Sequence, residues 1–262
     1  MCISGQPPEE TLRDAEAVVS GLEEHGLAVP LDRGAIHVWR VALDAYAGVP
    51  PRLDRTLSDD ERDRAARFRS PDDRRRFIVG RGMLRLILSR YLAVPPEDLR
   101  FRYGEHGKPE LDGQGSSNDI RFNLAHSNGV AVYAVTRGQE VGVDVERVRS
   151  WGDLEAVAER FFTPSEWFAL RGLPPRERDL AFFSCWTLKE AVLKAVGNGL
   201  TQHLDSFAVT VRPDEPAAFV AVAPGGRGLQ RWKLERLDLG EGYVGALCVE
   251  PPVCSIRYCM PA

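Results

Sequence analysis

The sequence predicts an α+β protein with two similar α+β lobes in one chain. The chain has 262 residues, enough for one large domain or two modest lobes at ~150 residues per domain. Each half shows the same predicted order of elements, a strand followed by helices and then by further strands. A turn at 137–139 separates the halves, which share no obvious sequence similarity.

This order divides the chain into four segments. The first is acidic and rich in Pro and Gly, and we expect a leader of uncertain order there; the last follows the final predicted strand. The segments are a leader at 1–34, an N-terminal α+β lobe at 35–137, a C-terminal α+β lobe at 138–250 and a tail at 251–262.

The N-terminal lobe is expected to begin with an alternating, β-branched strand at 36–41. Ser58 and Glu61 form the S-x-x-E pattern of a capping box, which predicts an Arg-rich helix through residue 69. A second helix is expected at 70–92, because its apolar residues recur mostly at helical spacing. Strands should follow at 99–103, 120–124 and 130–135.

The C-terminal lobe is expected to repeat that order, beginning with a strand at 141–148. Helices are predicted at 153–162, 164–170 and 176–196. The chain then becomes rich in strands, which are predicted at 207–211, 219–222, 231–237 and 243–249.

The composition is that of a soluble globular protein: 44% hydrophobic, 27% charged and 8% aromatic residues. The formal net charge of -4 argues against a general nucleic-acid binder. There is no apolar run of the ~18 residues that span a bilayer, and the N-terminus lacks the features of a secretory signal. The five cysteines show no paired spacing, so we expect a reduced, cytoplasmic protein rather than a zinc site at Cys254 and Cys259.

Two carboxylates, Asp144 and Glu146, alternate with valines in the predicted strand Gly-Val-Asp-Val-Glu at 142–146. Side chains alternate between the faces of a strand, so both carboxylates point the same way. Such a pair can bind a hard cation such as Mg²⁺ through its oxygen atoms. The alternative, which the pentapeptide alone favours, is an acidic strand face exposed to water.

The last predicted helix carries Glu190 and Lys194 four residues apart and therefore on one face. A pair at this spacing is usually a solvated ion pair on a helix surface. The other interpretation makes Glu190 a third carboxylate beside Asp144 and Glu146, with Lys194 as a phosphate or proton partner. The spacing does not distinguish the two.

Basic and imidazole groups supply further candidates. His126 lies where a strand ends in a polar turn, a position more often structural than functional. Lys108, one of only four lysines, lies in a Gly-Pro turn, where a solvated ammonium is the simple interpretation. An arginine cluster would bind an anion-rich ligand, pair with neighbouring acidic residues, or do both in part. It comprises Arg62, Arg64, Arg67, Arg69, Arg74, Arg75, Arg76, Arg81 and Arg85.

Several catalytic signatures are missing from the sequence. It contains no G-x-x-x-x-G-K-[ST], no G-x-G-x-x-G after a strand, no G-x-S-x-G and no H-E-x-x-H. P-loop NTPases, dinucleotide oxidoreductases, α/β-hydrolases and zincins therefore lose most of their support.

Four segments, in this order and spacing, resemble the 4′-phosphopantetheinyl transferases of the surfactin-synthetase-activating (Sfp) type. They are Glu-His-Gly-Lys-Pro at 105–109, Phe-Asn-Leu-Ala-His-Ser at 122–127, Gly-Val-Asp-Val-Glu at 142–146 and Trp-Thr-Leu-Lys-Glu-Ala-x-x-Lys-Ala-x-Gly-x-Gly-Leu at 186–200. Each segment alone is a weak signal, whereas the ordered set is specific. The resemblance extends from about residue 36 to about residue 249.

The resemblance implies a pseudo-dimer of two α+β lobes with coenzyme A bound in the cleft between them. It implies transfer of 4′-phosphopantetheine from coenzyme A to a serine of apo acyl or peptidyl carrier proteins, with release of adenosine 3′,5′-bisphosphate. Such carriers serve fatty-acid, polyketide or nonribosomal peptide synthesis. The implied enzyme depends on Mg²⁺ or Mn²⁺, and we expect a monomer without a nucleic-acid or membrane partner.

The resemblance also implies roles for individual residues. Asp144, Glu146 and Glu190 would hold Mg²⁺ against the pyrophosphate, and Glu190, directly or through a metal-bound water, would be the base for the carrier serine. Lys194 would bind phosphate or protonate the leaving group, whereas Lys189 lies on a different face of the helix. The residues expected to contact coenzyme A are Lys108, His126, Arg64 and, as a weaker candidate, Arg76.

Three departures from the family pattern concern nucleotide contacts rather than the metal site. Ala125 replaces a usual serine, Phe77 stands where a small polar residue is common, and Glu61 replaces a basic residue. Two alternatives remain: a non-catalytic module that binds coenzyme A or a carrier protein, and a metal-dependent nucleotide hydrolase. The carrier should dock near the cleft on aromatic candidates of which at least half are expected to be core, namely Trp151, Phe161, Phe162, Trp167 and Phe168.

Overall fold

The protein is a mixed α/β structure, as the sequence predicts. The computed structural model describes residues 2–3, 29–46, 48–104, 107–112, 119–150, 152–197, 203–223 and 228–259. Its α-helices are α2 (Pro51–Thr56), α3 (Asp59–Ala66), α4 (Pro71–Leu92), α5 (Leu154–Phe161), α6 (Pro164–Arg171) and α7 (Pro175–Val196). Short 3-10 helices lie at Leu43–Ala45, Pro96–Asp98, Leu204–Ser206 and Leu229–Arg231.

The strands form two main sheets and two short ladders. The strands are β1 (Cys2–Ile3), β2 (Ala35–Ala42), β3 (Phe101–Tyr103), β4 (Pro109–Leu111), β5 (Ile120–Ser127), β6 (Val130–Arg137), β7 (Val141–Arg147), β8 (Phe207–Val209), β9 (Phe219–Val222), β10 (Lys233–Leu237), β11 (Tyr243–Val249) and β12 (Ser255–Cys259). The larger sheet has the order β1-β12-β2-β6-β5, and the smaller sheet has the order β10-β11-β7. β3 pairs with β4, and β8 pairs with β9.

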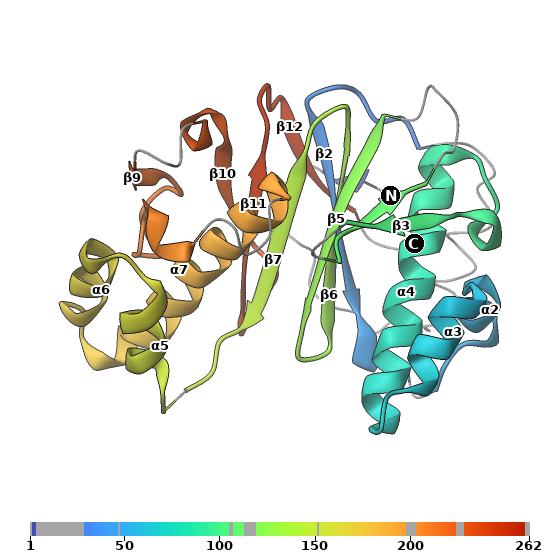
Figure 1. Ribbon diagram of the computed structural model, residues 1–262, viewed down its shortest axis with the longest axis horizontal. Coiled ribbons are helices and arrows are strands. Elements are labelled where there is room, and N and C mark those ends of the chain that lie inside the picture. Colours follow the sequence, from blue (N-terminus) through green and yellow to red (C-terminus); the bar gives the residue numbers. More distant parts are fainter. Residues whose placement is uncertain are drawn as a thin grey trace.

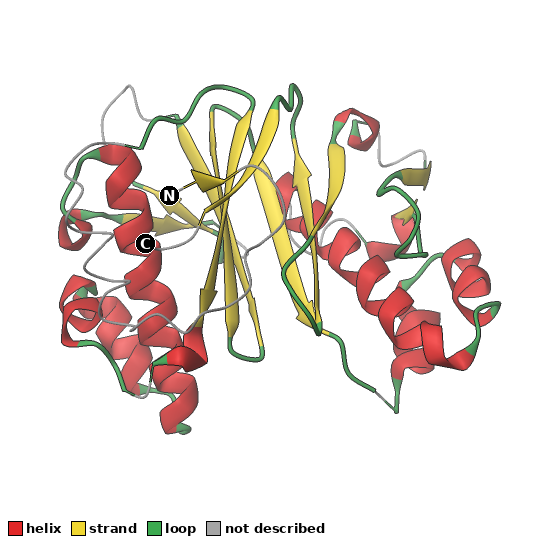
Figure 2. Cartoon of the chain, turned by 180° about the vertical axis from the view of Figure 1, so that it is seen from behind, coloured by secondary structure: helices red, strands yellow, loops and turns green. Residues whose placement is uncertain are grey.

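The two sheets lie in the middle of the molecule, with α4 on one side and α7 on the other (Figures 1 and 2). A core between the sheets joins valines of β2 and β6, such as Val38 and Val132, to Val143 of β7. On the outer faces, α4 buries Met83 against the larger sheet, and α7 buries Phe182 in a core shared with the smaller sheet. No helix in the described part of the chain is long and apolar enough to cross a membrane.

The C-terminal segment completes the sheet of the N-terminal half, where the sequence predicts only a tail. β12 pairs in parallel with β2, and its Cys259 lies opposite Trp39. β1 in turn pairs with β12, so part of the predicted leader is also a strand. The side chain of Gln139 stabilises this junction by accepting a hydrogen bond from Gly34 N (2.8 Å) and donating one to Pro252 O (2.7 Å).

The capping box predicted at the start of α3 is confirmed. The Ser58 amide donates a hydrogen bond to Glu61 Oε2 (3.0 Å), and the reciprocal contact from the N3 backbone to the Ser58 side chain is present. The helix ends at Ala66, three residues earlier than expected. α2 and β4 are not predicted from the sequence, because both are too short to show a clear periodicity.

A glycine allows α7 to lie directly against β7. A methyl group at Gly142 would overlap the Ala191 carbonyl oxygen and the Ala195 amide nitrogen. Only glycine permits this approach of backbone to backbone. Asp144 and Glu146 alternate with the buried valines of β7, so the approach brings the carboxylates close to the last turns of α7.

Candidate active site

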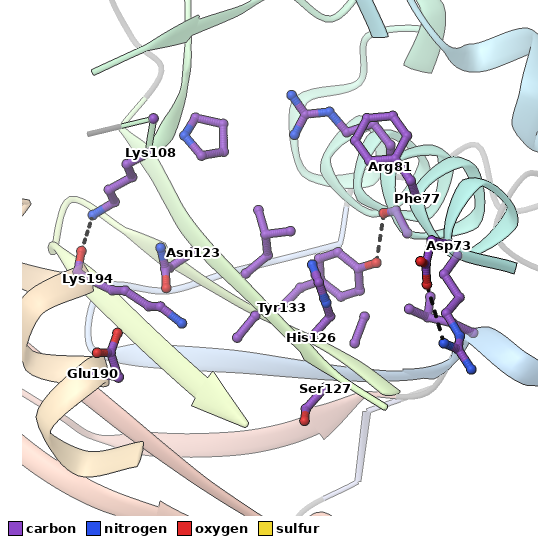
Figure 3. A pocket seen from close by; sticks show the side chains of 18 of the residues that line it. Asp73, Phe77, Arg81, Lys108, Asn123, His126, Ser127, Tyr133, Glu190 and Lys194 are labelled. Atoms are coloured by element: carbon purple, nitrogen blue, oxygen red, sulfur yellow. Dashed lines mark hydrogen bonds and ion pairs between the residues drawn. The ribbon is translucent and has the colours of Figure 1, made fainter. Parts of the chain in front are cut away.

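A pocket of about 1160 Å³ lies between α4 and α7 and extends along β5. In Figure 3, Phe77 and Arg81 project from α4, His126 and Ser127 lie on the strands, and Glu190 and Lys194 come from α7 on the opposite side. Six of the eight predicted site residues line this pocket: Arg64, Arg76, Lys108, His126, Glu190 and Lys194. Residues that are far apart in the sequence therefore share one cavity.

Asp144 is not among the residues that line the pocket, and it is only 5% exposed. Lys194 Nζ lies 2.5 Å from Asp144 Oδ1. Asp144 Oδ2 is buried and has no hydrogen-bond partner among the described residues. Burial raises the pKa of Asp144 to about 7, although the positive charge of Lys194 acts in the opposite direction. The alternative of a water-exposed acidic strand is therefore wrong for this residue.

Glu146 is half-buried and connects the two sheets. The Ser127 hydroxyl of β5 donates a hydrogen bond to Glu146 Oε2 (2.6 Å) and accepts one from the Arg147 amide (3.2 Å). Farther along the same pair of strands, the Val143 amide donates to Asn123 Oδ1 (2.8 Å). Side chains of β5 thus take the place of a backbone ladder between β5 and β7.

Glu190 and Lys194 share the face of α7 that lines the pocket. Glu190 is half-buried; desolvation, aided by the negative charge of Glu146, raises its pKa, while Lys194 acts to lower it. Among the described residues, no three His, Cys, Asp or Glu side chains are gathered into a metal-binding group. The structure therefore places Glu190 in the pocket, without closing a three-carboxylate cluster with Asp144 and Glu146.

Lys108 and His126 both line the pocket but differ in their surroundings. Lys108 Nζ donates to the backbone carbonyl of Lys194 (2.9 Å) and lies 3.4 Å from Glu140 Oε2. It therefore binds the C-terminal turn of α7, as the dashed line in Figure 3 shows. Desolvation, with the positive charges of Lys194 and Arg64, lowers the pKa of His126, whereas the negative charge of Glu146 acts to raise it.

The two predicted arginines already have partners on the α4 side of the pocket. The guanidinium of Arg64 lies over the ring of Phe77, 5.3 Å from its centroid. Arg76 Nε and Nη2 each lie 2.7 Å from a carboxylate oxygen of Asp44. Phe77, a departure from the family pattern, thus positions Arg64, whereas the charge of Arg76 is compensated by Asp44.

Glu61 is a buried anchor for the arginine cluster. Its side chain is 2% exposed and lies 2.5 Å from Arg81 Nε and 2.7 Å from Arg85 Nε. Arg81 also lines the pocket and donates to the Tyr103 hydroxyl. This part of the cluster is therefore buried and paired, whereas other members form surface pairs such as Arg62 with Asp59 (3.1 Å).

Several residues that shape the pocket were not predicted from the sequence. They include Ser127, Asn123, Arg81 and Tyr103. Alternation along β5 could have indicated two of them, because Asn123 and Ser127 lie at alternate positions and so share the face toward β7. Arg81 was noted only as a member of a cluster, and no local pattern marks Tyr103.

Lys189 lies away from the pocket, in agreement with its predicted position on another face of α7. Its side chain is fully buried, and Nζ lies 2.8 Å from both carboxylate oxygens of Glu166. Among the aromatic candidates, Phe162 is buried, Phe161 and Trp167 are packed against a core, and Phe168 is 81% exposed. Outside the described residues lie Trp151, Glu105, His106 and the segment 198–200.

Comparison with known proteins matches both halves of the chain to one family. A family model described as "4'-phosphopantetheinyl transferase superfamily" matches residues 140–248, and one described as "4'-phosphopantetheinyl transferase, N-terminal" matches residues 52–138. The 4'-phosphopantetheinyl transferase HetI of Nostoc sp. (strain PCC 7120) is 41% identical over 214 residues, covering 82% of this chain and 87% of the relative. The chain belongs to the 4′-phosphopantetheinyl transferase superfamily.

The phosphopantetheinyl transferase relatives include the type that the sequence motifs indicated. The 4'-phosphopantetheinyl transferase Sfp of Bacillus subtilis (strain 168) is 32% identical over 158 residues, covering 60% of this chain and 68% of that relative. The matched regions of the two family models, 52–138 and 140–248, contain all eight predicted site residues.

Proposed function

We propose that this phosphopantetheinyl transferase moves the 4′-phosphopantetheine group from coenzyme A to a serine of apo acyl or peptidyl carrier proteins. Adenosine 3′,5′-bisphosphate is the second product. The observation that carries the proposal is that Glu190 and Lys194 line the same pocket as Arg64 and His126. The membership of the chain in the superfamily supports the same reaction.

The reaction replaces a phosphoanhydride bond of the coenzyme A pyrophosphate by a phosphate ester bond to serine. Glu190 accepts the proton of the carrier serine, whose oxygen then attacks the phosphorus that bears pantetheine. The pyrophosphate P–O bond breaks, and its electron pair leaves with adenosine 3′,5′-bisphosphate. Desolvation of Glu190 suits it to a base, because a raised pKa strengthens its affinity for the proton. Lys194 binds the phosphate or protonates the leaving oxygen.

Basic side chains and the imidazole of His126 are proposed to contact the coenzyme A phosphates. Arg64 reaches the pocket from its ring contact with Phe77, and Lys108 and His126 are the other proposed contacts. Arg76 is the weakest, since Asp44 already satisfies its guanidinium. Buried Ala125 offers no hydroxyl, which reduces the number of nucleotide contacts relative to the family pattern.

We assign Asp144, Glu146 and Glu190 as the residues that would hold Mg²⁺ or Mn²⁺. The donor set suits a hard cation, because all three offer carboxylate oxygens, and Asp144 Oδ2 is buried with no hydrogen-bond partner in the described part of the chain. A bound divalent cation would neutralise the pyrophosphate and so favour its cleavage.

The proposed architecture is a pseudo-dimer of two lobes, 35–137 and 138–250, with coenzyme A in the cleft between them. The separate cores around Met83 and Phe182 support this division. Both walls of the pocket come from one chain, so we propose a monomer, and we place it in the cytoplasm. Among the described aromatic candidates, Phe168 is the one with an exposed side chain, and we propose it as a contact for a carrier protein.

The test is the intact mass of an apo carrier protein after incubation with the protein, coenzyme A and Mg²⁺. A gain of about one phosphopantetheine group (~340 Da), lost with a chelator and with Glu190→Gln, is expected for metal-assisted transfer. Glu235→Gln, at a partly exposed position of β10 that does not line the pocket, is the matched control. Hydrolysis of coenzyme A without a carrier would instead indicate a nucleotide hydrolase, and binding without turnover would indicate a binding module.

A further inference from the structure

Lys194 occupies the position of a counter-ion at Asp144. Its Nζ lies 2.5 Å from Asp144 Oδ1, and the Asp144 side chain is 7% exposed. The second oxygen, Oδ2, is buried without a hydrogen-bond partner among the described residues. A buried carboxylate needs compensation, and breaking a buried ion pair leaves an unpaired charge at high cost. The ammonium of Lys194 therefore supplies the positive charge that a bound metal would otherwise supply to this carboxylate.

We infer that Lys194 is a resident cation that competes with the divalent metal for Asp144 and exchanges this carboxylate for a coenzyme A phosphate when both ligands bind. The inference rests on the proposed function, since it takes Asp144 as a metal ligand. It assigns to Lys194 a role before the reaction begins: controlling when the metal site becomes available.

The surroundings of Lys194 permit this exchange without movement of α7. The carbonyl of Lys194 accepts a hydrogen bond from Lys108 (2.9 Å), which fixes the backbone of the last turn. The Lys194 side chain is 30% exposed and lines the pocket. A flexible four-carbon stem with an ammonium head can turn from the pocket wall to a ligand in the cavity.

Charge explains why the metal and coenzyme A should bind cooperatively. In the free protein, a metal at Asp144 would lie beside the ammonium of Lys194, and like charges at this distance repel each other. The pyrophosphate offers the ammonium a new anionic partner, which removes the repulsion. Asp144 then loses one cation and gains another. Couplings of this kind typically change affinity by about 5- to 150-fold.

The decisive measurement is Mn²⁺ binding to the free protein, followed by the electron paramagnetic resonance signal of unbound Mn²⁺. Lys194→Met should bind Mn²⁺ roughly tenfold or more tightly than the wild type without coenzyme A, because the competing ammonium is gone. Lys194→Arg is the matched control, and it should bind as weakly as the wild type. In a Lys194→Met background, Asp144→Asn should abolish the gain in Mn²⁺ affinity.

A thermal-unfolding measurement shows whether each Lys194 variant still folds. Lys194→Met leaves Asp144 without a counter-ion, so Mn²⁺ should raise its Tm more than that of the wild type. If Lys194→Met does not fold even with Mn²⁺, the same measurements are made on Lys194→Gln, which retains a hydrogen-bond donor. An unchanged Mn²⁺ affinity in the variant that folds would overturn the inference.

The carrier-protein assay separates this inference from the proposed function. If the wild type modifies the carrier while Lys194→Met gains no Mn²⁺ affinity, the competition is refuted and the transferase stands. If the wild type neither binds Mn²⁺ in the presence of coenzyme A nor modifies any carrier, both proposals are refuted. A tighter Mn²⁺ site in Lys194→Met with an active wild type supports both.

Discussion

The hydroxyl of Ser127 lies 2.6 Å from Glu146 Oε2 and joins β5 of the larger sheet to β7 of the smaller sheet. Its oxygen also accepts a hydrogen bond from the Arg147 amide (3.2 Å). One side chain therefore satisfies both a carboxylate and a backbone donor where no backbone ladder joins the two strands. His126, the neighbouring residue on β5, lines the pocket, so this contact ties the pocket wall to the strand that carries the acidic residues.

We expect Ser127→Ala to weaken both stability and activity. The substitution leaves a carboxylate and an amide without their partner, which should cost about 1.5–3 kcal/mol of unfolding free energy. Because we propose Glu146 as a metal ligand, carrier modification should slow by roughly 10- to 100-fold, the usual effect of losing a group that orients such a ligand. Urea unfolding and the rate of carrier mass gain measure the two effects. Ser127→Thr keeps the hydroxyl and should recover most of both; equal defects in the two variants would contradict the role of the hydroxyl.

Gly142→Ala should displace α7 from β7. The added methyl group would overlap the backbone of Ala191 and Ala195, which cannot yield as a flexible side chain does. We expect the free energy of unfolding to fall by about 1–3 kcal/mol, as for an overpacked core. Carrier modification should be lost as well. Gly152→Ala is the control, since nothing lies within 4 Å of a methyl group there. A variant at Gly142 with wild-type stability would show that the helix can shift without cost.

Lys189→Met should be among the more destabilising substitutions in α7. It removes the partner of Glu166, a residue that is 2% exposed and also accepts hydrogen bonds from the amides of Thr163 (2.8 Å) and Val209 (2.7 Å). Breaking such a buried pair costs about 3–5 kcal/mol, measurable by urea unfolding.

Lys233→Met provides the comparison for Lys189→Met. The Lys233 side chain is 48% exposed and pairs with Glu235 at 2.6 Å, so its loss should change stability by less than about 1 kcal/mol. Adding Glu166→Gln to Lys189→Met should recover part of the lost stability, because the unpaired charge disappears. Equal costs at the exposed and buried lysines would refute the importance of burial.

The stability contributed by His37 should fall as the solution becomes acidic. Its Nδ1 lies 2.8 Å from the Tyr91 hydroxyl, which also accepts a hydrogen bond from Trp39 Nε1 (2.8 Å). Burial, followed by the positive charge of Arg257, lowers the pKa of His37 from 6.5 to about 4. The folded-state pKa is therefore below the unfolded one, and the unfolded chain takes up the proton first.

This shift predicts a loss of about 2 kcal/mol from His37 between pH 7.5 and pH 5. His37→Asn keeps a neutral hydrogen-bond acceptor and does not titrate in this range. The difference in unfolding free energy between wild type and variant should therefore move by that amount in favour of the variant. A difference that is constant with pH would show that His37 is protonated equally in both states.

Local sequence patterns predict most of the secondary structure, and six of the eight residues they single out for the site line one pocket. The capping box at Ser58 and the helical spacing through residues 70–92 are local signals, and helices α3 and α4 follow them closely. Alternation in β7 correctly placed Val143 and Val145 in a core. Local periodicity fixes such features because they depend on neighbours a few residues away.

The tertiary structure alone decided which partners these residues meet. Periodicity places Asp144 and Lys194 on given faces, but only the close approach of α7 at Gly142 brings them within 2.5 Å. The sequence predicts only a tail where β12 forms, because the strand that pairs with it, β2, lies more than 200 residues earlier. Burial likewise separates Phe162 from exposed Phe168, although each directly follows another aromatic residue in the sequence. Contacts between distant segments depend on how whole faces fit together, and that fit is not encoded in local spacing.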